Sequence, residues 1–481
     1  MKRRVPLRAA LNSPATGWRA LLARTKMLIP PLATAILIGI GIGNGICIGN
    51  VIAQSLPAQS RDQTLGAVTC ASSLCHGAVK RWQDSPVLQN EYVTFTRTDK
   101  HARAYKVLLN ARSKKIAKNL GLKTPAHEAA LCLDCHAHNI PAARRGERFV
   151  FEDGITCESC HGPAERWIKP HVSPVGDSAA HHAANVENGL YPASEATARA
   201  RLCLSCHFGN KDKLVTHRIM GAGHPRMSFE LDTFTEIAPK HFTIDKDYGE
   251  RKKIWDGAKT WAIGQALAVS ETMDILADEK RGRDGLFPEL VLFDCHACHH
   301  PMSESRWKPK TVFGPSASPG LVRLNDANMI MLRALSAAVD PAMGERVRAQ
   351  AQKLHRAVAG EGDPRIEAAA LKALAMDASK AFADVNFTAL LVRRVLTGLI
   401  DDGLAGHYSD YAAAEQASMA IASVASFLEK QGALPAPGAF NAALKKLNAL
   451  LANDERYSPP LFRDRLQDLR GRAGASADQV K

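Results

Sequence analysis

Five short cysteine clusters, each followed directly by a histidine, constrain this chain more than any other feature of its sequence. Four have the regular spacing Cys-x-x-Cys-His. In such a pentad two thiols can add across the vinyl groups of one porphyrin, and the adjacent His can bind its iron from one side. The pattern therefore predicts covalently attached haem c. The regular clusters are Cys132, Cys135 and His136; Cys157, Cys160 and His161; Cys203, Cys206 and His207; and Cys295, Cys298 and His299.

The remaining cluster, Cys70 to His76, carries four residues between its cysteines. The longer loop still lets Cys70, Cys75 and His76 reach one macrocycle. We therefore predict five haems, which use ten of the eleven cysteines. The eleventh, Cys47, lies in an apolar run near the N-terminus.

Two other kinds of site use paired cysteines. Structural zinc sites use thiolate ligands in Cys-x-x-Cys pairs, but zinc does not need a His after every second cysteine. Disulfides within the clusters would close only tiny loops and would stabilise little. The repeated His favours haem over both.

The first 53 residues have the pattern of an export signal. A basic region without acidic residues precedes Met27 to Ile52, which carries no charge. Val51, Ile52 and Ala53 suit cleavage before Gln54. An uncleaved membrane anchor is the alternative, because the apolar run is long enough to span a bilayer. Both interpretations place the remainder outside the cytoplasm, and we expect a periplasmic protein.

The formal charge of +14 does not indicate a nucleic-acid partner. Half of it lies in the first 26 residues, which would leave with the export signal. The propionates of five haems, about ten in all, would more than neutralise the remainder if fully exposed. We expect redox proteins as partners, with a membrane-associated respiratory complex as one candidate, and no nucleic acid.

The composition divides the exported chain in two. Residues 54–310 hold every cysteine cluster, and they include a segment of helical apolar spacing from Ile263 to Glu279. Lys308 to Gly320 is rich in Pro, Gly and Ser. After this linker, Asp363-Pro364 predicts a helix start. Apolar residues at helical spacing then predict an antiparallel bundle over about 320–472, within a C-terminal region of 311–481. The expected fold is mainly α, with little sheet.

Thirteen histidines remain to complete the five irons from the other side. His101, His171, His217 and His224 each adjoin a locally stiffening feature, as a fixed ligand requires. Four others remain alternatives: His181, His182, His241 and His300. His127, His138 and His296 lie near the clusters and suit propionate hydrogen bonds, whereas His355 and His407 fall in the bundle.

The type of second ligand sets the haem potential. Methionine raises it, whereas a second imidazole leaves it low. Abundant His and no convincing Met ligand predict mostly bis-histidine haems of low potential. An iron with an open side could instead bind a small molecule.

Several stretches resemble the multihaem family typified by cytochrome c-554, a four-haem carrier that accepts electrons from hydroxylamine oxidoreductase. They are the first cluster, FTRTDKHARAYKVL around His101, CLDCH, GITCESCHGPAERW with the following His171, and CLSCH, within about residues 64 to 305. The resemblance implies that His171 completes the iron of His76 and His101 that of His207. It also implies an open side at the second haem, on His136.

Three features depart from that family: the longer first loop, the fifth cluster and the helical region after residue 320. His217 and His224 would then serve the irons of His161 and His299 in either order.

The leading hypothesis is an exported five-haem cytochrome that relays electrons between redox partners. The alternative is an enzyme that reduces or oxidises a small nitrogen or sulfur compound at an open haem on His136, although no catalytic residue is assigned. A third hypothesis is a scaffold subunit docked through its helical bundle.

Overall fold

The computed structural model describes residues 55–173, 177–252, 254–284, 287–300, 312–313 and 323–474. The predicted export segment and most of the predicted linker lie outside the described residues. Within these ranges, no helix combines the length and the apolarity that crossing a bilayer requires.

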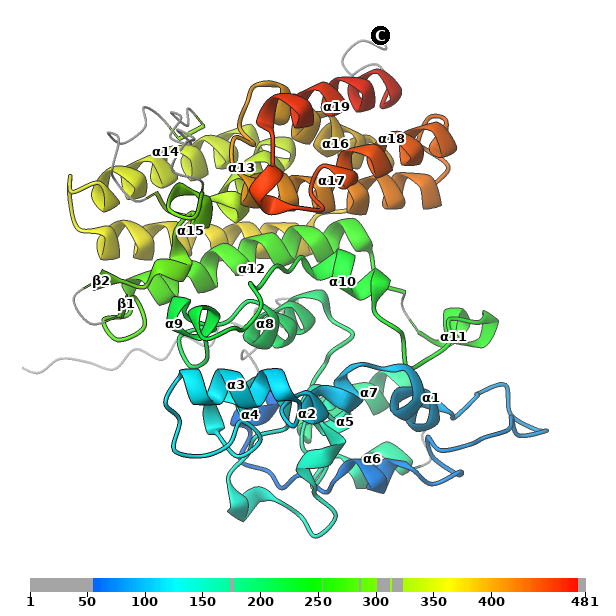
Figure 1. Cartoon of the computed structure of the whole chain (residues 1–481). Helices are drawn as coiled ribbons and strands as arrows, with labels where there is room; N and C mark the ends of the chain where they lie inside the picture. The colour runs from blue at the N-terminus through cyan, green and yellow to red at the C-terminus, as the bar shows by residue number, and fades with distance from the viewer. Residues whose placement is uncertain are drawn as a thin grey trace, which may run out of the picture. The chain divides into compact units, whose positions relative to one another are not determined.

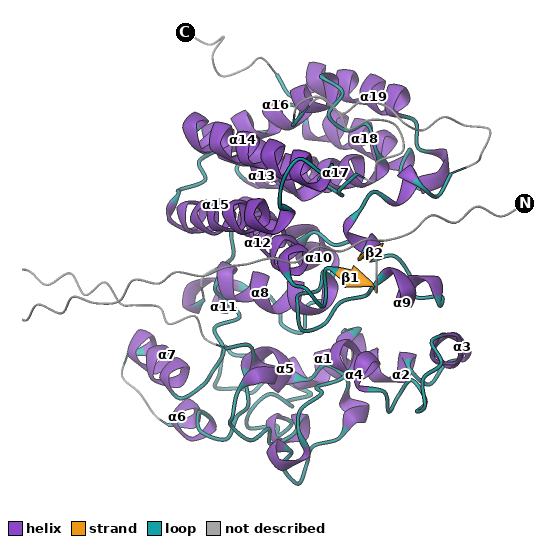
Figure 2. Ribbon diagram, turned by 90° about the vertical axis from the view of Figure 1, so that its left-hand side faces the viewer, coloured by secondary structure: helices purple, strands orange, loops and turns teal. Residues whose placement is uncertain are grey.

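Nearly all regular secondary structure of the described chain is helical, which confirms the prediction of a mainly α fold (Figures 1 and 2). In its N-terminal half the α-helices (labelled α) and 3-10 helices (labelled η) are short and are separated by loops rich in Gly and Pro. They are η1 (Pro57–Gln59), η2 (Ala67–Cys70), α1 (Glu91–Thr98), η3 (His101–Arg103), α2 (Ala104–Val107), α3 (Ala111–Asn119), α4 (Ala130–His136), η4 (Ala142–Arg144), η5 (Phe151–Asp153), α5 (Cys157–His161), α6 (Ile168–Val172), α7 (Ser178–Glu187), α8 (Ala196–His207), α9 (His217–Gly221), α10 (Leu231–Ile237) and α11 (Lys246–Arg251).

The long helix α12 (Gly257–Ala277) contains most of the helix predicted from Ile263 to Glu279. It is apolar on nearly every side, and residues such as Trp261 and Met273 are fully buried. A helix that is apolar all round must be covered on all sides. Accordingly, α12 packs along α15 and also contacts α8, α10, α13 and α17 (Figure 1).

The start of α12 depends on one side chain. The Asp256 carboxylate accepts a hydrogen bond from the backbone N–H of Lys259 at 3.0 Å. We expect Asp256→Ala to lower the free energy of unfolding by about 1 kcal/mol, because the first turn loses its cap. Urea unfolding followed by circular dichroism would measure the change. Asp256→Ser keeps an acceptor and should stay close to the parent, so equal losses in both variants would contradict this role for the cap.

Helices α13 to α19 form the predicted C-terminal helical region. The predicted start at Asp363-Pro364 is confirmed, since the Asp363 carboxylate accepts from Arg365 N–H and Pro364 is the first residue of α15. On α17 the apolar residues at helical spacing that predict the bundle, from Ala417 to Leu428, are buried. The helices are α13 (Ala327–Val339), α14 (Pro341–Val358), α15 (Pro364–Asp384), α16 (Ala389–Leu404), α17 (Tyr411–Lys430), α18 (Pro437–Ala449), η8 (Asp454–Arg456) and α19 (Pro459–Arg472).

The two halves share one hydrophobic core. A continuous cluster of buried residues runs from α8 through α12 into the C-terminal helices. Residues 53–481 accordingly form one compact unit, and the division at 310/311 stays a prediction. Between α12 and the fifth cluster lie a short antiparallel hairpin, β1 (Arg283–Asp284) and β2 (Phe287–Pro288), and the short turn η6 (Leu290–Leu292), while η7 (Cys295–Ala297) is part of the cluster itself.

Candidate haem-binding site

Three of the cysteine clusters form the last turn of a helix. Helix α4 ends at His136, α5 at His161 and α8 at His207. Residues three apart on a helix lie on the same face, so both thiols of each cluster point to one side. The His that follows then leaves the helix end close to the same side. This local geometry is what two thioether bonds and one axial ligand on a single porphyrin require.

The longer first cluster is folded into a compact turn. The Cys75 N–H donates to the Ser72 carbonyl at 2.9 Å, and the His76 N–H donates to the Cys70 carbonyl at 3.2 Å. The turn closes on itself at Gly77, where an added Cβ would lie 1.8 Å from the Ala71 carbonyl oxygen. The extra residues are therefore taken up within the loop, and Cys70 and Cys75 stay next to His76.

Each cluster histidine faces a second imidazole from another part of the chain. The ring centroids lie between 5.9 and 6.4 Å apart in all five cases. The pairs are His76 with His171, His136 with His224, His161 with His241, His207 with His101, and His299 with His217.

These spacings fit one iron between each pair of rings. An imidazole nitrogen lies about 2 Å from a transition metal that it binds, and the ring centre lies roughly 1 Å further out. Two imidazoles on opposite sides of one iron therefore have centroids about 6 Å apart. The angle between the ring planes is free to vary, because each ring can rotate about its bond to the metal. The residues present thus fit haem with two histidine ligands at every cluster.

Two of the pairs are those that the family resemblance implies. His171 faces His76 with 17° between the ring planes, and Trp167 meets His171 edge-on at 5.5 Å. His101 lies 5.9 Å from His207. The structure therefore brings these residues together although 95 and 106 positions separate them in the sequence.

Two of the other three pairs differ from the expectation. His224 faces His136, on the side expected to be open, instead of serving His161 or His299. His241, one of the alternatives, faces His161 at 6.3 Å. Only His217 meets one of its expected partners, His299.

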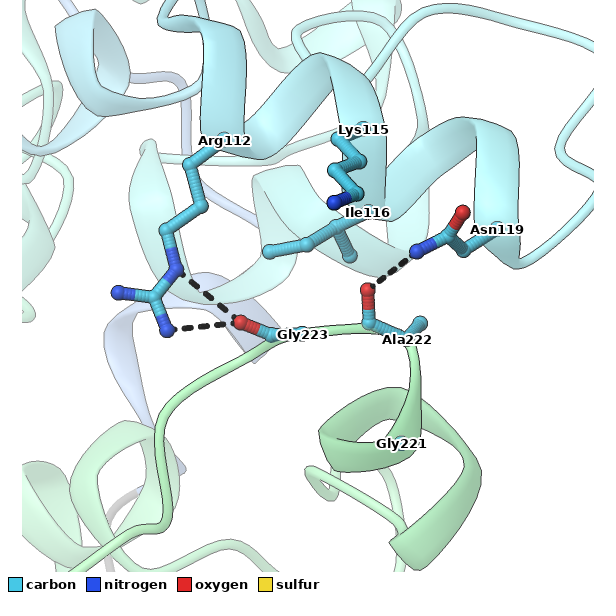
Figure 3. A pocket seen from close by; sticks show the side chains of 7 residues that line it. All are labelled: Arg112, Lys115, Ile116, Asn119, Gly221, Ala222 and Gly223. Atoms are coloured by element: carbon cyan, nitrogen blue, oxygen red, sulfur yellow. Dashed lines mark hydrogen bonds between the residues drawn. The ribbon is translucent and has the colours of Figure 1, made fainter.

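The turn that presents His224 is held by helix α3 (Figure 3). The Arg112 guanidinium donates two hydrogen bonds to the Gly223 carbonyl, at 2.8 and 3.1 Å, and the Asn119 amide donates to the Ala222 carbonyl at 2.9 Å. A pocket of about 330 Å³ lies between α3 and this turn. These bonds fix the backbone immediately before His224, and so hold its ring where it faces His136.

Burial keeps several of the facing rings neutral, which is the form that binds a metal. It lowers the pKa of His161 to about 4, and it also lowers the pKa values of His136, His171 and His207. Burial lowers the pKa of His241 as well.

Two of the facing rings, those of His76 and His101, have a carboxylate beside Nδ1 instead. The Glu91 carboxylate lies 3.0 Å from His76 Nδ1, and the Asp99 carboxylate lies 3.0 Å from His101 Nδ1. These hydrogen bonds raise the pKa values of both histidines. In each case Nδ1 faces the carboxylate, which leaves Nε2 for the iron.

Five of the remaining described histidines have other partners. His138 is buried against the Thr64 hydroxyl, and His127 lies 3.5 Å from the Glu128 carboxylate. His181 stacks on His171, but neither residue belongs to a cysteine cluster and His181 Nε2 contacts the Pro170 carbonyl at 2.8 Å. In the bundle, His355 and His407 lie beside Asp326 and Asp402.

Contacts between cysteines show which clusters are neighbours. A hydrogen bond with Cys157 raises the pKa of the Cys70 thiol, and a hydrogen bond with Cys206 raises that of Cys135. Cys160 in turn interacts with Cys203. The first, third, fourth and second clusters therefore follow one another in space. The fifth adjoins the second through α9, because His217, the first residue of α9, faces His299 and His224, three residues after its last residue Gly221, faces His136.

The sequence alone gave little reason to choose His241. It lies in a loop between α10 and α11, without the helix start or tight turn that marked the other ligands. The number of cluster histidines is the one signal that points to it. Five cluster histidines need five partners, and only four other histidines adjoin a stiffening feature. In the structure the aromatic ring of Phe95 meets His241 edge-on.

Comparison with known proteins adds one match. Residues 69–162 match the family model of cytochrome c554 and c-prime, which spans the first three cysteine clusters. No curated protein and no solved structure matched the chain.

Proposed function

From the premise that this chain is a c-type cytochrome of the cytochrome c554 and c-prime family, matched over residues 69–162, we propose that it is an exported five-haem electron carrier. Electron transfer is the activity that the family match supports. The number of haems, the export and the partners are our proposal.

The chain's own residues would hold each haem in two ways. The paired thiols would form thioether bonds by adding S–H across a vinyl C=C, with no leaving group. The facing imidazoles, such as those of His76 and His171, would bind the iron. Bound in this way, haem c supplies one-electron chemistry between ferric and ferrous iron.

One observation carries the proposal: every cluster histidine has a second histidine ring about 6 Å away. An iron with two imidazole ligands has no position for a substrate, and it needs little rearrangement on gaining an electron. This arrangement supports electron transfer and disfavours catalysis at the haem of His136, where His224 would be the second ligand of the iron.

The order of the clusters supports a relay. Thiols of the first and third clusters, and of the second and fourth, contact one another. Haems attached to neighbouring thiols must lie near each other. One electron taken from a redox protein donor could then pass along the series and leave to a redox protein acceptor, so that the carrier returns to its starting state.

Two measurements on the oxidised, purified protein test the proposal. Electron paramagnetic resonance should give only low-spin ferric signals, unchanged by nitrite, nitric oxide or hydroxylamine. Mass spectrometry should give five haems per chain. A high-spin signal that responds to these molecules would favour the enzyme hypothesis, and four haems would point first to the cluster from Cys70 to His76.

The same mass spectrum tests the export. We propose a periplasmic protein whose first 53 residues direct export, on the basic and apolar pattern of that segment. The mature chain is then expected to begin at Gln54. A mass that includes residues 1–53 would indicate an uncleaved anchor.

A further inference from the structure

Helix α1 carries a carboxylate at each end, and each lies against a histidine of one of the facing pairs, His76 or His101. Glu91 is the first residue of the helix and Asp99 follows its last residue as the C-cap. Asp99 is 9% exposed, so little water screens its charge.

The Glu91 carboxylate serves the first cluster. It lies 3.0 Å from Nδ1 of His76, which leaves Nε2 toward His171. Glu91 also lies close enough to His241 to interact with it electrostatically.

The Asp99 carboxylate lies between two histidines that belong to different pairs. One oxygen lies 3.0 Å from His101 Nδ1 and also accepts from the His101 backbone N–H at 2.9 Å. The other oxygen lies 3.9 Å from His241 Nδ1. Because His101 faces His207 and His241 faces His161, one charge acts on the ligands of two adjacent clusters.

The pair at the second cluster has neutral partners instead. His136 Nδ1 contacts the Ala104 carbonyl at 3.2 Å, and His224 Nδ1 contacts the Pro225 carbonyl at 2.8 Å. A carboxylate behind an imidazole makes it a stronger donor to the metal than a carbonyl does. Its negative charge also stabilises ferric over ferrous iron.

We infer that the two carboxylates of α1 set differences in reduction potential, an inference that rests on the proposed function. Glu91 and Asp99 lower the reduction potentials of the haems at His76, His161 and His207 relative to that of the haem at His136. Glu91 and Asp99 are positioning residues, since they act through His76, His101 and His241. Because an electron moves downhill toward the higher potential, the charges on α1 favour flow from the first cluster toward the second.

A redox titration of the holoprotein, followed by electron paramagnetic resonance, tests this inference. Asp99→Asn keeps the acceptor for the His101 backbone N–H and removes only the charge. At a fixed applied potential it should raise the reduced-to-oxidised ratio of one low-spin haem about tenfold, equivalent to about 59 mV for a one-electron couple. A second haem should shift in the same direction by less, since its His241 lies further from Asp99. Glu91→Gln should shift a third haem.

Two control variants test whether the shift depends on the charge at Asp99. Glu128→Gln removes a carboxylate beside His127, which faces no cluster histidine, and should shift no haem. Asp99→Glu keeps the charge and should stay near the parent. If Asp99→Asn keeps all haems low-spin but shifts none, or shifts all five equally, the inference is wrong and the carrier proposal stands. A high-spin signal in the parent protein would instead overturn the carrier proposal.

Discussion

Replacing His224 by glycine is expected to convert one of the five proposed low-spin haems to a high-spin form. His224 is the ring that faces His136, so its loss opens one side of that iron. The turn before it should persist, because Arg112 and Asn119 hold the carbonyls of Gly223 and Ala222 and not the imidazole. Electron paramagnetic resonance of the oxidised protein would show the new signal, and added imidazole should restore the low-spin spectrum.

A matched replacement separates this effect from a general disturbance. His182 lies exposed on α7, and His182→Ala should leave every haem low-spin. If His224→Gly leaves the spectrum unchanged, another group binds opposite His136 and the assignment of this pair is wrong.

Replacing Asp232 by asparagine is expected to stabilise the protein at pH 8 and to flatten its dependence on pH. Burial and the neighbouring Glu230 raise the pKa of Asp232 to about 7, from an ordinary value near 4. Between these values the folded state holds a proton that the unfolded state releases, so stability falls as the pH rises from about 4 to 7. Removing the ionisable group should therefore raise the free energy of unfolding at pH 8 by an amount on the order of 2 to 4 kcal/mol.

Urea unfolding at pH 4.5 and pH 8, followed by circular dichroism, would measure this change. Parent and variant should differ much less at the lower pH, where Asp232 is protonated in the folded state. Glu236→Gln is the control on the same helix, because that side chain is more exposed and pairs with Lys430 at 3.3 Å. Equal destabilisation of Asp232→Asn at both values would show that the ionised carboxylate is needed in the fold.

The sequence predicted the parts of the site that are local. In a Cys-x-x-Cys-His pentad the thiols and the first His are adjacent, so a helical turn such as α5 is enough to position them. The start of α15 was equally local, since Asp363 and Pro364 set it by capping and by a fixed φ. The mainly α fold followed from the apolar periodicity.

The partner imidazoles could not be read from the sequence in the same way. Which rings meet depends on how distant segments pack, and local stiffness is only an indirect sign of a ligand. His224 adjoins a stiff turn, yet it meets His136 because α3 holds that turn. His241 has no such turn and still faces His161.

Packing also crosses the expected division of the chain. Helix α12 lies before the predicted linker, but its apolar surface is buried largely by α15. A helix without a polar face needs neighbours on every side, and composition alone did not say which segments would supply them.

The order in sequence of each cluster histidine and its partner has a consequence for the synthesis of the protein. His171, His224 and His241 all follow in sequence the cluster histidines that they face, by 95, 88 and 80 positions. His101 and His217, in contrast, precede theirs. As the chain emerges during synthesis, the first three clusters must therefore wait for later segments before their imidazole pairs are complete, whereas the last two find their partner already present.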